Sequence, residues 1–128
     1  MVSISNQSCI MNSFEKLVYW QKARQLTKEI YSLTSLFPKE EQYGLSAQIR
    51  RAAVSISSNI AEGYGRQYRA DYIHFLNVSR GSCYEVMSQL LLCIDLGFIQ
   101  EQQAKKSQEL CEEIGKMLNS AIQSLQNK

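Results

Sequence analysis

The arginines are the residues of this 128-residue chain whose chemistry is most informative. A guanidinium group stays charged at physiological pH and binds a phosphate through two parallel hydrogen bonds. We therefore predict phosphate contacts for five of the six arginines, with the sixth and one lysine as secondary candidates. The primary candidates are Arg50, Arg51, Arg66, Arg69 and Arg80, and the secondary candidates are Lys22 and Arg24. For each of them, pairing with a glutamate or simple solvation is the alternative.

The charge of the chain is unevenly distributed. The formal net charge is only +2. Residues 1–80 carry ten Lys or Arg and six Asp or Glu, a net of +4, whereas residues 81–128 carry four and six, a net of −2. Any basic surface is therefore expected from the first 80 residues.

Arg50 and Arg51 stand directly before an uncharged run that extends from Ala52 to Ala61. Neighbouring residues on a helix point about 100° apart, so both arginines can flank an apolar face without entering it. Two interpretations stay open. The arginines contact phosphates on the surface, or they form salt bridges within or between subunits, to Glu62 or to an acid of the last helix.

Arg66 and Arg69 are interleaved with Tyr64 and Tyr68 where a helix pattern breaks. Basic and aromatic residues in one loop can hold phosphates and stack bases. The alternative is a turn closed by tyrosine packing and by a pair between Arg66 and Glu62. We favour that alternative for Tyr64 and leave both arginines open.

Arg80 lies in the middle of a predicted helix, beside small residues. It is expected either in the central pore of an assembly or in a salt bridge with Asp71 or Glu85. His74 is the only histidine, so no zinc ligand set and no catalytic triad can be assembled around it. No phosphate-binding P-loop, nucleophile elbow or HExxH motif is present. We therefore expect no enzymatic activity, no metal and no cofactor.

Four cysteines, at positions 9, 83, 93 and 111, show neither CxxC spacing nor a disulfide framework. We expect reduced thiols, mostly buried as small apolar groups. The first residues lack a basic start followed by an apolar run, and no apolar stretch approaches the length of a membrane span. A cytoplasmic location without membrane contact is expected.

The hydrophobic pattern repeats at helical spacing throughout the chain. Helices are predicted over 13–36, 39–62, 68–96 and 100–126, with residues 1–12 as a loose tail and Met11 as an alternative start. Ser13 is the expected N-cap of the first helix, Pro38 separates the first two helices, and Gly97 is the expected C-cap of the third. Gly81 is expected where two backbones approach closely. Four long helices with short links predict one all-α domain over 13–128, an antiparallel up-down four-helix bundle.

The second predicted helix carries no charge on either face over almost three turns. Its core-facing residues at helical spacing are Ile49, Ala52, Ala53, Ile56 and Ile60. The opposite face, where a surface helix normally carries Lys and Glu, is small and uncharged. We therefore predict an interface with another subunit through Val54, Ser55, Ser58 and Ala61. The residues that end this helix, interpreted as a structural turn, are Asn59, Glu62, Gly63 and Gly65, with a positive φ expected at Gly63.

Several motifs occur in a fixed order along the chain. They are FxxLxxWxxA from Phe14, IYxLT from Ile30, FPKEExYGL from Phe37, QIRRAAVSIxSNIAEG from Gln48 and FLxxxRGSxxE from Phe75. Together they resemble bacterial four-helix-bundle proteins encoded by intervening sequences in 23S rRNA genes, sometimes labelled S23 ribosomal proteins. The chain departs from that family at Ser57, where proline is frequent, and at Ser79, where alanine is usual.

The resemblance implies a ring-like homo-oligomer, typically a pentamer. It also implies a relative, the accessory protein of diversity-generating retroelements, which binds nucleic acid and a reverse transcriptase. In a pentamer each arginine is presented five times, so modest patches become a basic belt. The expected function is nucleic-acid binding, above all of RNA, with little sequence readout. The alternatives are a protein-interaction scaffold, such as a reverse-transcriptase subunit, and a purely structural oligomer.

Overall fold

The computed structural model describes residues 13–128, and the predicted tail, with Cys9 and Met11, lies outside them. The long helices are α2 (Val18–Thr34), α3 (Leu45–Tyr64), α4 (Arg69–Asp95) and α5 (Glu101–Gln126), and two short 3-10 helices are η1 (Ser13–Lys16) and η2 (Lys39–Glu41). The described residues contain no strand. The all-α prediction is therefore confirmed.

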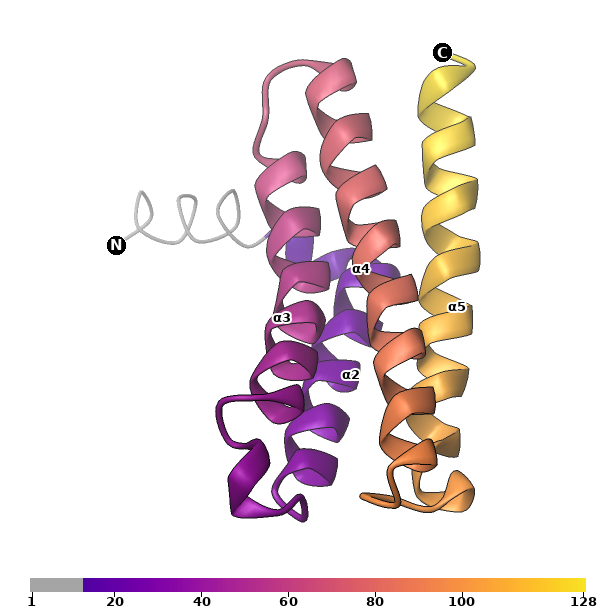
Figure 1. Cartoon of the computed structure of the whole chain (residues 1–128). Coiled ribbons are helices and arrows are strands. Elements are labelled where there is room, and N and C mark those ends of the chain that lie inside the picture. Colours follow the sequence, from indigo (N-terminus) through magenta and orange to yellow (C-terminus); the bar gives the residue numbers. More distant parts are fainter. Residues whose placement is uncertain (1–12) are drawn as a thin grey trace, which may run out of the picture.

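The four long helices run antiparallel, with the α3–α4 connection at one end of the molecule and the other two connections at the opposite end (Figure 1). Each long helix packs against two others: α3 lies against α2 and α4, and α5 lies against α4 and α2. This arrangement is an up-down four-helix bundle, as the four periodic segments predict.

The core is formed by the residues that the apolar periodicity selects. The fully buried residues come from all four long helices. They are Ala23, Leu26 and Ile30 of α2, Ile49, Ala53, Ile56 and Ile60 of α3, Leu76, Val86 and Leu90 of α4, and Ala104, Ile114 and Leu118 of α5. All five residues predicted for the core-facing side of α3 are among the buried ones. Burial of a Leu or Ile side chain contributes about 1.5–3 kcal/mol, so this continuous layer is the main source of stability.

Two helices begin later than predicted. Helix α2 has Leu17, rather than Ser13, at its N-cap, because Leu17 adopts an extended backbone with φ −71° and ψ 123° after the short η1 turn. Helix α3 begins at Leu45, because Lys39–Glu41 form the separate turn η2. Glu41 still serves the helix end, since its carboxylate accepts a hydrogen bond from the Leu45 N–H at 3.1 Å. An acid at this position satisfies an otherwise unpaired donor and complements the helix dipole.

Gly97 ends α4 as predicted. It has a φ of +78°, and the N–H of Phe98 donates to the carbonyl of Cys93 at 2.9 Å, as in a Schellman motif. Gly63 differs from the prediction, because it is a helical residue of α3 without a positive φ. A Cβ atom at Gly63 would lie 2.7 Å from the Cβ of Phe75, the shortest such distance for any described glycine. Gly63 therefore allows a close approach between α3 and α4.

Gly81 does not mark a close approach within this chain. It is exposed on α4, and a Cβ atom there would meet no heavy atom within 4 Å. The corresponding prediction is wrong for the single chain. The small residue of α4 that contacts α3 is instead Ser79, which is fully buried and donates a hydrogen bond to the carbonyl of Ile56 at 2.8 Å. Ser82 adds a second polar link, a 2.9 Å hydrogen bond with Ser55 of α3.

Candidate functional site

The α3–α4 turn brings two candidate arginines to one end of the bundle. Arg66 forms an exposed ion pair with Glu62 at 3.2 Å, and its guanidinium lies 4.9 Å from the centre of the Phe75 ring. Tyr64 packs edge-on against Tyr72 with the ring centres 5.9 Å apart. Arg66 and Tyr64 therefore follow the structural alternative for this turn, a pair with Glu62 and tyrosine packing.

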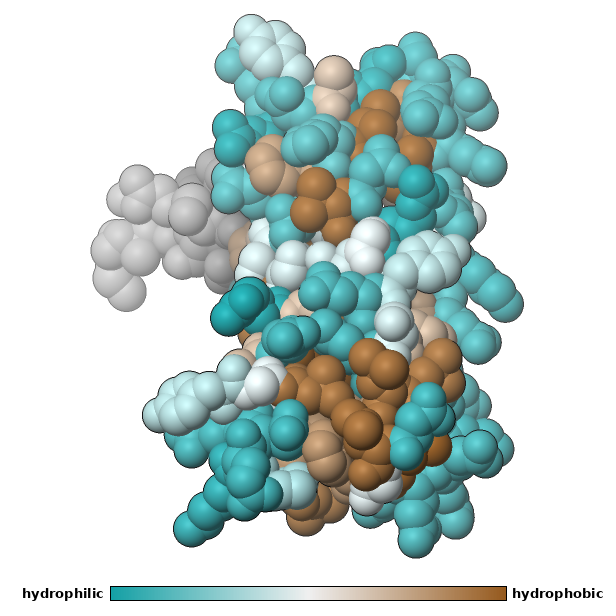
Figure 2. All heavy atoms as spheres, viewed as in Figure 1, coloured by the Kyte–Doolittle hydropathy of each residue, from teal (hydrophilic) through white to brown (hydrophobic). Residues whose placement is uncertain are grey.

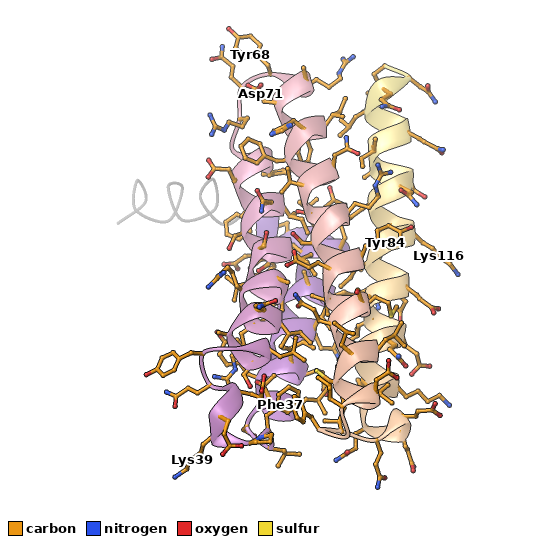
Figure 3. All side chains as sticks on the ribbon, viewed as in Figure 1. Phe37, Lys39, Tyr68, Asp71, Tyr84 and Lys116 are labelled. Atoms are coloured by element: carbon orange, nitrogen blue, oxygen red, sulfur yellow. The ribbon has the colours of Figure 1, made fainter. Side chains whose placement is uncertain are left out.

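Arg69 and Tyr68 at the same turn are free of such contacts. Tyr68 is 65 % exposed and projects from this end of the bundle (Figure 3). Arg69, the first residue of α4, is exposed and forms no ion pair with the described residues. This cation and the adjacent ring are accessible to a ligand.

Arg50 and Arg51 have different surroundings. The Nε of Arg50 donates to the hydroxyl of Thr34 at 2.7 Å, and its guanidinium lies 4.5 Å from the centre of the Tyr31 ring. Arg50 thus ties α3 to the end of α2. Arg51 is exposed and has neither a hydrogen bond nor an ion pair within residues 13–128. No salt bridge joins either arginine to Glu62 or to an acid of α5 in that range.

Arg80 is held by neutral groups. Its two terminal nitrogens donate to the side-chain oxygens of Asn77 and Asn119, each at 2.7 Å. No carboxylate of the described chain lies within 4 Å of it, so the expected salt bridge with Asp71 or Glu85 is absent. The amide oxygens fix the direction of the guanidinium but leave its charge uncompensated, which leaves it available to an anion.

The secondary candidates lie on α2. Lys22 forms an ion pair with Glu113 of α5, and this pair spans the contact between the first and last helices. Arg24 is exposed, with its guanidinium 5.6 Å from the centre of the Trp20 ring. Of these two secondary candidates, Arg24 is the one without a carboxylate partner in the described residues.

Five of the seven candidate cations lack a carboxylate partner within the described part of the chain, since only Lys22 and Arg66 are in ion pairs. Three of the five lie on different parts of the bundle. Arg69 lies at one end of the bundle, Arg51 is exposed on α3, and Arg80 lies on α4 where it contacts Asn119 of α5. A continuous basic surface would therefore need more than one copy of the chain.

The uncharged side of α3 is partly accessible, as an interface prediction requires. Val54 and Ser58 are exposed and Ala61 is half-buried. Ser55 differs, because its hydroxyl bonds Ser82 of the same chain and accepts from Asn59 at 3.0 Å. The Asn59 amide also donates to the Ser55 carbonyl at 2.8 Å, so Asn59 stabilises the helix turn preceding it.

Exposed leucines occur in the last part of α4 and directly after it. They are Leu91, Leu92 and the C-cap residue Leu96, which are 51 %, 47 % and 61 % exposed and together are called the leucine patch. Figure 2 shows hydrophobic atoms spread over the corresponding lower part of the face formed by α3 and α4. Large exposed apolar patches on a soluble domain mark interaction surfaces. Sequence reasoning assigned these leucines no role, although the run of three leucines from Leu90 to Leu92 was a visible signal.

A half-enclosed cavity of about 230 Å³ lies between α4 and α5. Cys83, Met87 and Cys111 provide the apolar part of its lining. Arg80 and Asn119 lie at its polar part. Neither the cavity nor Asn119 could be identified from the sequence, because both depend on the register between the two helices. Asn77 precedes Arg80 by three residues, and this spacing was a signal for their contact.

The cysteine thiols near the cavity are poor nucleophiles. Burial raises the pKa of Cys83 and of Cys111 to about 12, so both thiols stay protonated at neutral pH. Within residues 13–128 no group of three His, Cys, Asp or Glu side chains is arranged to hold a metal ion, and no helix is long and apolar enough to cross a membrane. His74 is exposed on α4.

Comparison with known proteins identifies relatives of this bundle. The family described as 23S rRNA-intervening sequence protein matches residues 15–120. A crystal structure of a protein of unknown function, from the S23 ribosomal protein family of Bacteroides thetaiotaomicron, superposes with a TM-score of 0.75 at 30 % sequence identity. The alignment covers 81 % of this chain and 97 % of that protein. No curated protein matches the chain.

Proposed function

The chain belongs to the family of 23S rRNA-intervening sequence proteins, and on that basis we propose that it is a non-enzymatic, cytoplasmic nucleic-acid-binding protein whose main ligand is RNA. The observation that supports this proposal most directly is the set of arginines without carboxylate partners in residues 13–128. Uncompensated guanidinium groups are suited to bidentate phosphate contacts. Because these arginines lie on different sides of the bundle, the ligand is expected to be long and polyanionic.

Assembly into a ring, with five subunits as the family resemblance implies, would join the separated arginines into a repeated belt. Two features support self-association. One is the uncharged side of α3 with Val54 and Ser58, and the other is the leucine patch that includes Leu92. Sedimentation of the purified protein tests the subunit count. A pentamer would have five times the 14.7 kDa mass of the chain, and a monomer at micromolar concentration would refute the ring.

The binding test is fluorescence anisotropy with a structured RNA, a duplex DNA and a single strand, at low and near-physiological salt. Phosphate contacts release counterions, so affinity is expected to fall steeply with salt. Arg51→Ala and Arg69→Ala should weaken binding without loss of helix content, because both side chains are exposed and unpaired in the described chain. The absence of binding at low salt would refute the proposed function.

Lys22→Ala is the matched control. It removes one positive charge, as the arginine variants do, but this charge is already paired with Glu113. We expect its effect on affinity to be clearly smaller than that of Arg51→Ala. Equal effects of the two variants would mean that net charge alone matters, and the assignment of Arg51 as a contact residue would then be wrong.

The leucine patch supports a second candidate function, a protein-interaction scaffold such as the accessory subunit of a reverse transcriptase. Leu91, Leu92 and Leu96 expose apolar surface that nucleic acid does not require. Leu92→Glu would separate the possibilities. A loss of self-association assigns the patch to the ring, whereas an intact ring that no longer captures a reverse transcriptase assigns it to the scaffold.

A further inference from the structure

The cavity between α4 and α5 has the size of a single ring. Its volume is about 230 Å³, whereas pockets for complete drug-sized ligands occupy about 300–1,000 Å³. An apolar cavity of about 150 Å³ is large enough to bind benzene. The cavity is therefore large enough for one flat aromatic group and too small for an entire nucleotide.

The walls of the cavity suit the faces of an aromatic ring. Cys83 and Cys111 are buried, and Met87 is half-buried beside them. Tyr84 lines the same cavity and is 71 % exposed, so its ring is free to stack on a group that enters from solvent. Figure 3 shows Tyr84 on the side of α4 that faces α5, at the height of Lys116. Base–aromatic stacking is tolerant of base identity, because every base has a π-face.

The charged groups at the cavity favour an anion attached to that ring. Arg80 and Lys116 contribute two positive charges to the lining and Glu112 one negative charge, a net of +1. The Arg80 guanidinium is held in place by the Asn77 and Asn119 oxygens, at 2.7 Å each, and these neutral partners do not cancel its charge. A phosphate beside the bound ring would therefore meet a cation that is already oriented.

We propose that this cavity receives one unpaired nucleobase, with Tyr84 stacked on the base and Arg80 and Lys116 beside its phosphate. This inference rests on the proposed function and adds a specificity to it, a preference for single strands over duplexes. A base in a duplex is covered by its stacked neighbours, so it cannot enter a cavity one ring wide. Replacement of a stacking aromatic by alanine weakens single-strand binding by roughly 5- to 150-fold per base.

The test compares a fluorescent 12-nucleotide oligouridine with an abasic oligomer of the same length and with a 12-base-pair RNA duplex, by anisotropy with the full chain. The abasic oligomer keeps the phosphates and lacks the bases. We expect oligouridine to bind at least five-fold more tightly than the abasic oligomer, and the duplex to bind like the abasic oligomer.

Two variants with matched controls locate the effect. Gly115→Phe fills the cavity, since a Cβ atom at Gly115 meets no heavy atom within 4 Å, and Gly115→Ala is its control. Tyr84→Ala removes the stacking ring from an exposed position, and Tyr84→Phe keeps it. We expect Gly115→Phe and Tyr84→Ala to lose the preference for oligouridine while abasic affinity is unchanged, and both controls to retain it.

The outcomes separate the two proposals. If wild-type protein binds oligouridine and the abasic oligomer equally, with strong salt dependence, the cavity inference is overturned and the proposed function stands. If none of the three probes binds at low salt, the proposed function fails and the cavity inference fails with it. A preference that survives Tyr84→Ala also overturns the inference, because the bases then bind elsewhere. Because Tyr84 is exposed, Tyr84→Ala tests the inference even if Gly115→Phe does not fold.

Discussion

Gly63→Ala is expected to destabilise the bundle although alanine is the better helix former. In a helix interior, replacement of glycine by alanine contributes about 1 kcal/mol of stability. The added methyl group at this position would lie 2.7 Å from the Cβ of Phe75 and 3.0 Å from a ring carbon of Tyr72. Neither atom is the free end of a flexible chain, so α3 and α4 must separate. Overpacking of this kind costs about 1–3 kcal/mol, and a 2.7 Å approach to a Cβ atom, which cannot move without its backbone, belongs to the upper part of that range. A cost of about 2–3 kcal/mol against a gain of about 1 kcal/mol leaves a net loss of about 1–2 kcal/mol.

Thermal unfolding followed by circular dichroism at one fixed protein concentration measures this loss. For a chain of this length, a net loss of about 1–2 kcal/mol corresponds to a decrease in Tm of about 4–8 °C. Gly81→Ala is the control, because a methyl group there meets no heavy atom within 4 Å, and an increase in Tm is expected. An unchanged or raised Tm for Gly63→Ala would refute the argument that close helix packing selects glycine at this position.

Three further predictions concern stability and charge. Ser79→Ala should lower the free energy of unfolding by about 1 kcal/mol in urea titrations, because the buried hydroxyl no longer donates to the Ile56 carbonyl. Burial raises the pKa of the described thiols from 9.0, to about 12 for Cys83 and Cys111 and about 11 for Cys93. Below pH 9 these thiols are protonated whether the chain is folded or unfolded. Above it the unfolded chain loses protons first, so the free energy of unfolding should fall between pH 9 and 12. In a Cys9→Ser variant, labelling by a thiol reagent at pH 8 should require unfolding, and fast labelling of the folded protein would contradict this burial. Glu62→Gln should strengthen RNA binding, because it releases Arg66 from its exposed ion pair, while Tm changes little. Weaker RNA binding by Glu62→Gln would show that the pair itself positions Arg66.

The helices could be predicted from the sequence because their apolar residues repeat at one period. Ile49, Ile56 and Ile60 lie on one face of a helix, and this apolar face must be buried against the other helices. The starts of α2 and α3 were predicted too early, because capping depends on local backbone geometry. Leu17 is extended and Glu41 caps its helix from an outside turn, and neither feature changes the hydrophobic period.

The candidate site was predictable in residue type but not in partner. The sequence identifies Arg80 as a cation, but its partner Asn119 is 39 residues further along the chain. Their contact depends on the register of α4 against α5, which the sequence does not give. The same holds for Lys22, whose partner Glu113 belongs to the last helix. Gly81 and Gly63 show the limit most clearly. Gly81 was predicted inside a helix and Gly63 in the turn after one, whereas both are helical in the structure and only Gly63 has a neighbouring helix at contact distance.

The contact between α2 and α5 has a consequence for the order of folding. The other three helix pairings, α2 with α3, α3 with α4 and α4 with α5, join helices that follow one another in the chain. Pairings between successive helices close short loops and form rapidly, whereas α2 and α5 must meet across the whole domain. Their seam, spanned by the Lys22–Glu113 ion pair, is therefore expected to close last, so substitutions within it should accelerate unfolding and leave the folding rate almost unchanged.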